Sequence, residues 1–198
     1  MRFFFFGLLR DKDLLELVID RPLPVQAFHR ARLGDARLVC LRDETSPMLV
    51  GNPGAWVAGV IVEGLTEADL ERIHFFESLE YEPCTVEVEP LDGGRVEAIA
   101  FAATARTAHD DEEWRFQDWV ARHKTQDLRE TELWMAFFGH LEIAEADRRW
   151  DEALAAGRSI EDLVREVRGA PRRARSRDTR RYSQEGLNSL LDPTIKKT

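Results

Sequence analysis

Four consecutive phenylalanines, Phe3 to Phe6, constrain the fold of this chain more than any other segment. A short run that is apolar at every position is typical of a buried strand, with both faces covered by other parts of the chain. Gly7 ends the run, and Asp11 is placed to cap a short helix that contains Leu14 and Leu15. The sequence therefore predicts a strand, a turn and a helix that pack into the core of a domain.

The length and the cysteine content fit one reduced, soluble domain with a small appendage. The chain has 198 residues, and a chain of this size buries about 70% of its unfolded surface without help from disulfides or metals. Its two cysteines, Cys40 and Cys84, are far apart, and its five histidines form no paired ligand motif. We therefore expect no metal site and a reducing compartment.

The net charge of −9 is unevenly distributed along the chain. Residues 171–198 carry +5, with six arginines, whereas residues 1–170 carry −14. The acidic body repels nucleic acid and anionic membranes, so neither is an expected partner. The basic tail has little to bury, and we expect it to be flexible and available for self-association or for docking on the body. The apolar N-terminal stretch is shorter than a signal peptide core, and no stretch reaches about 18 apolar residues, so we expect a cytoplasmic protein.

Hydrophobic patterning predicts four more strands, at Ala36–Leu41, Trp56–Glu63, Thr85–Glu89 and Val96–Ala102. Prolines and glycines between residues 47 and 54 predict a loop between the first two of these strands. Asp92-Gly93-Gly94 predicts a hairpin turn between the last two. Thr66, followed by Asp69, predicts the start of the clearest helix.

The pattern becomes helical after residue 107. Trp114, Phe116 and Trp119 form one helical face, and Leu133–Ala156 predicts one or two further helices that stop at Gly157. Ser159 is placed to cap a last short helix. The expected fold class is α+β, with a strand-rich part over residues 1–105, a helical extension over 106–168 that packs on it, and the basic tail over 169–198.

Two segments carry residues that could perform chemistry. The first is Phe6-Gly7-Leu8-Leu9-Arg10-Asp11, where a strand turns into a helix start and exposes backbone N–H groups. The second contains Glu77 at the end of an apolar helical face, where burial would raise its pKa toward the range of a general base. An ordinary turn and a solvated helix-end glutamate are the alternatives, and Glu80 and Glu82 compete with Glu77.

These segments, in this order, resemble the gamma-glutamylcyclotransferase-like family, which includes avirulence-induced plant proteins and the butirosin-pathway cyclotransferase. Its apolar strand and Tyr-Gly-Ser/Thr-Leu loop correspond to Phe6-Gly7-Leu8-Leu9. Its Gly-Leu-Thr segment and its Leu-Asp-x-Phe-Glu helix end correspond to Gly64-Leu65-Thr66 and Ile73-His74-Phe75-Phe76-Glu77, followed by Tyr81. The resemblance covers about residues 1–137.

The resemblance implies a small mixed β-barrel with flanking helices. It also implies cyclisation of a γ-glutamyl amine to 5-oxoproline with release of the amine, an acyl transfer that needs no cofactor. Glu77 matches the catalytic glutamate of the family, and Phe6 to Asp11 match its substrate-binding loop. Tyr81 would either contact the substrate or complete the barrel rim.

Three residues depart from the family pattern: Phe6 replaces tyrosine, Leu8 replaces serine or threonine, and His74 replaces aspartate. Two hydroxyls are thereby lost from one loop, while its backbone amides remain. A non-catalytic family member that binds a small molecule or a protein is therefore the alternative to an enzyme.

Overall fold

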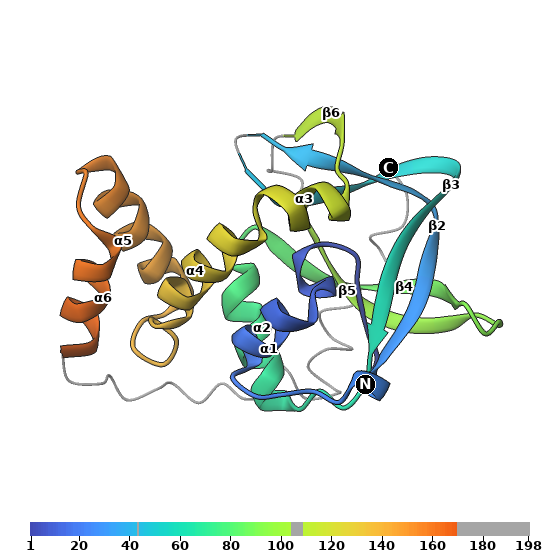
Figure 1. Ribbon diagram of the computed structural model, residues 1–198, viewed down its shortest axis with the longest axis horizontal. Helices are drawn as coiled ribbons and strands as arrows, with labels where there is room; N and C mark the ends of the chain where they lie inside the picture. The colour runs from blue at the N-terminus through green and yellow to red at the C-terminus, as the bar shows by residue number, and fades with distance from the viewer. Residues whose placement is uncertain (43, 104–108, 170–198) are drawn as a thin grey trace.

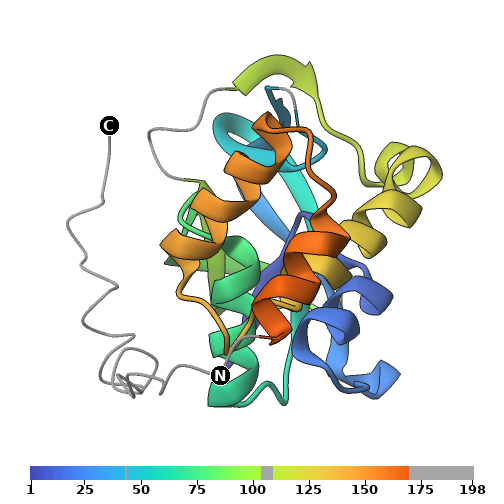
Figure 2. The ribbon, with the colours of Figure 1, turned by 90° about the vertical axis from the view of Figure 1, so that its left-hand side faces the viewer.

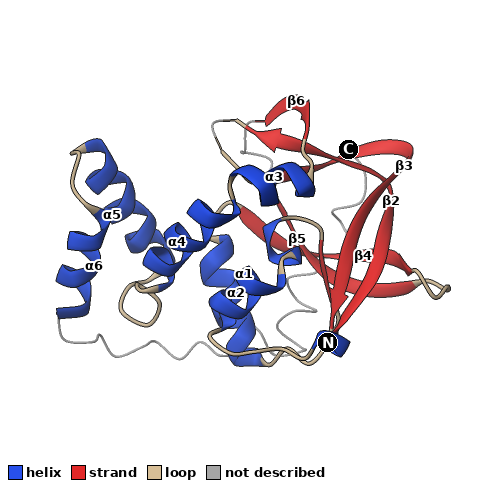
Figure 3. Cartoon of the chain, viewed as in Figure 1, coloured by secondary structure: helices blue, strands red, loops and turns tan. Residues whose placement is uncertain are grey.

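The computed structural model describes residues 1–42, 44–103 and 109–169. Five strands close into a mixed barrel, with a group of helices at one side (Figures 1 and 3). Around the barrel the order is β3-β1-β5-β4-β2, and β2 pairs again with β3. The strands are β1 (Phe3–Phe5), β2 (Phe28–Leu41), β3 (Pro47–Val62), β4 (Tyr81–Pro90) and β5 (Val96–Ala103). Only β1 and β5 run parallel within this closed set. The expected α+β class and the mixed barrel are confirmed.

The phenylalanine run forms the buried strand that its composition predicts. Phe3, Phe4, Phe5 and Phe6 are each at most 4% exposed, and β1 pairs with β3 on one side and β5 on the other. Gly59 on β3 makes room for this strand, because a Cβ there would lie 2.5 Å from the Phe4 ring and 2.6 Å from the Phe5 carbonyl oxygen. Burial of one such side chain stabilises the folded chain by about 1.5–3 kcal/mol. This strand is therefore a main part of the core.

The prediction of a loop between residues 47 and 54 is wrong, since β3 extends from Pro47 to Val62. Its turn residues instead form a bulge. Gly34 pairs with Trp56 and Ala36 pairs with Gly51, so residues 52–55 leave the ladder opposite Asp35. The Asp35 carboxylate accepts the Gly54 N–H at 2.8 Å, and the two strands can therefore extend past these prolines and glycines.

The hairpin of β4 and β5 is confirmed, with its turn at residues 91–95. A sixth strand, β6 (His109–Glu113), was not expected because its residues are acidic and not alternating. It pairs with the end of β2, and Arg37 of β2 and Arg42, the residue after it, form ion pairs with two of its aspartates, Asp111 and Asp110. Cross-strand charge pairing thus holds a strand that lacks an apolar face.

The two N-terminal α-helices begin where their capping residues indicate. Asp11 accepts the N–H groups of Asp13 and Leu14 at the start of α1 (Lys12–Ile19). Thr66 and Asp69 form a reciprocal capping box at the start of α2 (Glu67–Glu77). Two short 3₁₀ turns, η1 (Leu8–Arg10) and η2 (Val25–Ala27), flank α1.

The helical second half differs in detail from the expectation. Its helices are α3 (Phe116–Arg122), α4 (Lys124–Met135), α5 (Ile143–Ala155) and α6 (Ile160–Gly169). Residues 133–156 therefore hold the end of α4, a connection and α5. The expected cap of the last helix is confirmed, because Ser159 accepts the Asp162 N–H. The start of α4 could not be predicted, because the helix is covered on only one face and most of its residues are polar.

The helices form a layer beside the barrel. Helix α4 contacts both α1 and α2, and α5 and α6 pack together on its far side (Figures 1 and 2). The boundary at residue 105 stays a prediction, although β6 beyond it joins the barrel strand β2. The predictions for the tail over 169–198 concern residues outside the described part of the chain, apart from Gly169. No described helix combines the length and the apolar character needed to cross a membrane.

Candidate active site

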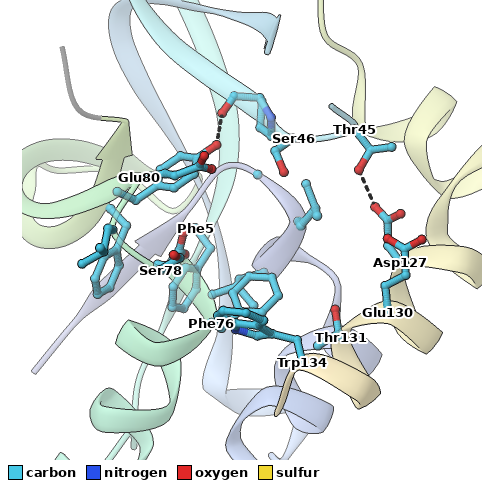
Figure 4. A pocket seen from close by; sticks show the side chains of 18 of the residues that line it. Phe5, Thr45, Ser46, Phe76, Ser78, Glu80, Asp127, Glu130, Thr131 and Trp134 are labelled. Atoms are coloured by element: carbon cyan, nitrogen blue, oxygen red, sulfur yellow. Dashed lines mark hydrogen bonds between the residues drawn. The ribbon is translucent and has the colours of Figure 1, made fainter. Parts of the chain in front are cut away.

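A cavity of about 590 Å³ opens between the barrel and the helical layer. Its walls come from the end of β1 and the following turn, from residues 45–47, from the end of α2, and from α4 and α5. Figure 4 shows Phe5, Phe76 and Ser78 on one side and Asp127, Glu130 and Trp134 of α4 on the other. Two regions that are separate in sequence therefore form one concave site.

The loop after β1 supplies Phe6, Gly7, Leu8 and Leu9 to this cavity. Arg10 donates the first backbone hydrogen bond of the turn, to the Gly7 carbonyl, so the N–H groups of Leu8 and Leu9 have no partner within it. Gly7 lets the loop approach residue 47, because a Cβ on Gly7 would lie 3.0 Å from Cγ of Pro47. At Gly7 the loop thus comes close to Pro47 in the opposite wall of the cavity.

Arg10 and Asp11, which the sequence places in the same loop, do not line the cavity. The Arg10 guanidinium lies over the Phe116 ring, 4.5 Å from its centroid. Asp11 caps α1 and forms an ion pair with Lys124 at 2.8 Å. These contacts connect the loop to α3 and α4, so Arg10 and Asp11 support the cavity wall without lining it.

Glu77, the last residue of α2, lines the cavity. The residue is half-buried, and desolvation of its carboxyl group by the surrounding protein raises its pKa from the ordinary 4.5 to about 8. Its carboxyl forms no hydrogen bond or ion pair with any other residue that the structure describes. Glu80 also lines the cavity but is exposed, and Glu82 lies outside it. Burial therefore separates Glu77 from the two neighbouring glutamates.

Ser78 follows Glu77 in a backbone conformation that disfavours any residue with a side chain, with φ 57° and ψ −149°. Such a conformation costs about 1–3 kcal/mol and persists only where other contacts hold it. The Ser78 hydroxyl donates to the carboxylate of Asp147 on α5, at 2.8 and 2.9 Å from its two oxygens. An α5 side chain therefore fixes the residue next to Glu77.

Tyr81 lines the cavity and also completes the rim. Its hydroxyl donates to the Pro47 carbonyl at 3.1 Å. Burial, reinforced by the nearby Glu77 carboxylate, raises the pKa of Tyr81, which keeps the hydroxyl protonated. The position of Tyr81 at the barrel rim is thus supported by this hydrogen bond, and its contact with a substrate stays a prediction.

The cavity residues of α4 and α5 were missed by the sequence reasoning. They are Asp127, Glu130, Thr131, Trp134, Asp147, Trp150 and Asp151. Asp127 is structural, because it accepts the Thr45 hydroxyl at 2.8 Å and the Trp119 indole N–H at 2.6 Å. No local pattern marks these residues, since their helices come together only in the folded chain. Within the described residues, no cluster of three or more His, Cys, Asp or Glu is arranged to hold a metal ion.

A family model described as gamma-glutamyl cyclotransferase, AIG2-like, matches residues 3–121 of the chain. The chain belongs to this family. Two of its Arabidopsis thaliana relatives are AIG2-like protein C, 26% identical over 157 residues, and protein AIG2 A, 28% identical over 128 residues. These alignments cover 75% and 61% of this chain and 84% and 70% of the relatives.

A solved structure of another Arabidopsis thaliana protein is similar to this chain with a TM-score of 0.49 and 23% identity. The match covers 65% of this chain and 86% of that one. The family match contains β1, the loop after it, Glu77 and Tyr81, and it ends within α3. The region matched by the family model therefore includes only part of the cavity wall, and α4 and α5 lie beyond it.

Proposed function

We propose that the protein is a γ-glutamylcyclotransferase that converts a γ-glutamyl amine to 5-oxoproline and releases the amine. One observation carries the proposal: the turn at Gly7 and the half-buried Glu77 line the same open cavity. The family match supports the reaction class.

The reaction is an intramolecular acyl transfer. The α-amino nitrogen of the glutamyl group attacks the γ-carbonyl carbon, a new C–N bond forms, and the bond from that carbon to the amine nitrogen breaks. The proton lost by the attacking nitrogen is needed by the departing one, so the atoms balance without water or a redox partner. The protein has to fold the glutamyl chain into a five-membered ring and move this proton.

Glu77 would move the proton. An α-amino group has an ordinary pKa of about 8, and burial brings the pKa of Glu77 to about 8 as well. Proton transfer between two groups of similar pKa has little thermodynamic cost, and the enclosed setting places the carboxyl close to the attacking nitrogen. Glu77 would first accept that proton and then donate it to the leaving nitrogen.

The N–H groups of Leu8 and Leu9 would bind the γ-carbonyl oxygen as it acquires negative charge. Leu8 and Phe6 provide no hydroxyl to this step, so backbone donors would carry the stabilisation. Tyr81 keeps its proton, but its hydroxyl already donates to the Pro47 carbonyl. Its proposed role is therefore to shape the rim of the cavity. Small-molecule γ-glutamyl amines are thus the proposed partners.

Mass-spectrometric detection of 5-oxoproline tests this function. The full chain is incubated with a panel of γ-glutamyl amines and amino acids, and we expect release of 5-oxoproline and free amine in equal amounts from at least one class. Release of free glutamate in place of 5-oxoproline would assign hydrolysis and overturn the proposal.

The missing hydroxyls at Phe6 and Leu8 favour one other function, a non-catalytic member that binds a small molecule in the same cavity. Binding of intact γ-glutamyl amines without turnover, measured by calorimetry and followed by recovery of unchanged ligand, would support that second function.

A further inference from the structure

Lys124, the first residue of α4, occupies a position that disfavours a positive charge. The N-terminus of a helix carries the positive end of the helix dipole, so a lysine there is unfavourable and an acidic residue is preferred. The residue before it, His123, provides no side-chain cap for α4. The needs of the helix itself therefore do not explain this lysine, and its contacts with the rest of the fold do.

Two carboxylates near the N-terminus of the chain hold the Lys124 ammonium group. Its Nζ lies 2.8 Å from an oxygen of Asp11 and 2.7 Å from an oxygen of Asp13. The side chain of Asp11 is 11% exposed, whereas that of Asp13 is 67% exposed. Burial lowers the pKa of Lys124, but its hydrogen bonds with the two carboxylates raise the pKa by more, so the ammonium group stays charged. The contact with Asp11 is the shielded one, where solvent and salt weaken an ion pair least.

Asp11 divides its two carboxylate oxygens between α1 and α4. Its Oδ1 accepts the N–H groups of Asp13 and Leu14 and so caps α1, and its Oδ2 accepts the Lys124 ammonium group. The Asp11 N–H donates to the Leu8 carbonyl at 2.9 Å and closes the turn η1. A single residue therefore joins the end of η1, the start of α1 and the start of α4.

The same turn of α4 also holds the opposite wall of the cavity. Asp127 lies three positions after Lys124, on the same face of the helix, and it accepts the Thr45 hydroxyl at 2.8 Å (Figure 4). Thr45 is two positions before Pro47, the residue that the loop after β1 approaches at Gly7. The first turn of α4 is therefore tied to both sides of this approach.

Lys124 itself does not line the cavity. It therefore acts on a bound substrate through the loop after β1, whose Leu8 and Leu9 N–H groups are the proposed donors to the γ-carbonyl oxygen. Other contacts fix the middle of this loop, because the Leu9 side chain is buried and the Arg10 guanidinium lies over the Phe116 ring. Lys124 fixes its end.

We propose that Lys124 is a positioning residue, which through Asp11 holds the turn η1 in the place that the reaction needs. The contact aligns the backbone donors of the loop with the oxygen that acquires charge, and it comes from a helix beyond the region that the family model matches. This inference rests on the proposed function and assigns to it a residue outside the cavity wall. Its consequence is a loss of turnover with little change in substrate binding, because the alignment matters most in the transition state.

Steady-state kinetics of two variants test the inference on a γ-glutamyl amine that the parent converts. Lys124→Met keeps the length of the side chain and removes its charge, and we expect kcat to fall about tenfold while KM changes by less than about twofold. Lys124→Arg keeps the charge and the donors, and it should restore most of kcat. A Lys124→Met protein with the kcat of the parent, a loss that lies mainly in KM, or a Lys124→Arg protein as slow as Lys124→Met would overturn the inference.

Asp13→Asn is the matched control, because it neutralises the exposed partner of Lys124 and keeps the contact with Asp11. It should retain the parental kcat. A loss equal to that of Lys124→Met would assign the effect to the exposed ion pair and contradict the proposal. Melting temperatures of all variants should stay within about 4 °C of the parent, since ion pairs of this kind contribute little to global stability.

A double-variant cycle tests whether Lys124 acts through Asp11. Asp11→Asn keeps a side chain that caps α1 and removes the negative charge. If the two residues form one unit, the variant with both Lys124→Met and Asp11→Asn should be no slower than the slower single variant. Losses that multiply would show independent effects and contradict the proposed route.

Amide hydrogen exchange keeps the inference testable if the parent converts no γ-glutamyl amine. That outcome would count against the proposed function, and NMR would then follow the loop directly. The N–H groups of Arg10 and Asp11 close η1, and we expect them to exchange about tenfold faster in Lys124→Met than in the parent, with the amides of β1 unchanged. Parental exchange at both residues would overturn the inference.

Discussion

The Ser78 hydroxyl reaches across the cavity edge to the Asp147 carboxylate on α5, 69 positions further along the chain. It thereby holds the residue next to Glu77 in a strained backbone conformation. Helix α5 lies beyond the part of the chain that the family model matches. The helical extension therefore takes part in positioning the end of α2, and the barrel alone would not define the site.

The contribution of this contact is tested at Asp147. Asp147→Ala removes the acceptor, and we expect kcat to fall about tenfold with a smaller change in KM, because a misplaced Glu77 weakens proton transfer more than binding. Asp147→Asn keeps an oxygen that accepts the same hydrogen bond, and it should retain most of the parental kcat. Equal losses in both variants would show that the charge of Asp147, and not its contact with Ser78, is required.

A second pair of variants tests the backbone strain at Ser78. Ser78→Gly removes the side chain that disfavours this conformation, whereas Ser78→Ala keeps the Cβ and loses the hydroxyl. We expect the melting temperature of Ser78→Ala to lie below that of Ser78→Gly. The reverse order would mean that a Cβ at position 78 is not strained in this conformation.

The loop after β1 gives a prediction about substrate turnover. Leu8→Ser restores a hydroxyl at the position where the family has one, and it should raise kcat/KM for γ-glutamyl amines by several-fold. A hydrogen bond of this kind contributes about 0.5–1.5 kcal/mol. Leu8→Ala is the matched control, since it removes the same bulk without adding a donor. If Leu8→Ala raises the activity as much as Leu8→Ser, the gain comes from space and the argument from the hydroxyl is wrong.

The raised pKa of Glu77 predicts a dependence of stability on pH. Its pKa is about 8 in the folded chain and 4.5 ordinarily, so the folded state holds the proton more tightly. The stability that this provides is complete below pH 4.5 and is lost as the pH rises through 8. Gln at position 77 stays neutral, so the melting temperature of Glu77→Gln relative to the parent should increase between pH 5 and pH 9.

Thermal unfolding of both proteins over this pH range, with Glu82→Gln as the matched control, checks the prediction. A difference between Glu77→Gln and the parent that is constant from pH 5 to pH 9 would show that Glu77 does not carry a raised pKa.

The parts of the fold that the sequence predicted are those set by local patterns. The phenylalanine run, the caps at Asp11 and Thr66, and the hairpin turn each depend on residues within a few positions of one another. The strand β6 and the extension of β3 through residues 47–54 depend on pairing with β2. The strand propensity of these residues does not predict such pairing. Arginine partners on or next to β2 and a bulge in β3 allow strands where the local sequence favours a loop.

The same distinction applies to the candidate site. Glu77 and the Gly7 turn were found from short segments and from the family resemblance. Asp147, Asp151 and Trp150 could not be found in this way, because the position of α5 at the cavity depends on the packing of distant helices against one another. Their residue types are also those of an ordinary amphipathic helix, in which acidic residues usually face solvent.

The most direct test of the whole account is the rate of 5-oxoproline release by Glu77→Gln, compared with the parent and with Glu82→Gln, on a γ-glutamyl amine that the parent accepts. Glutamine keeps the volume of the side chain and cannot accept the proton, so kcat should fall by about a hundredfold or more. Circular dichroism should show an unchanged fold in the same samples. A Glu77→Gln protein that releases 5-oxoproline at a rate close to that of the parent would contradict the assignment of Glu77 as the acid–base group.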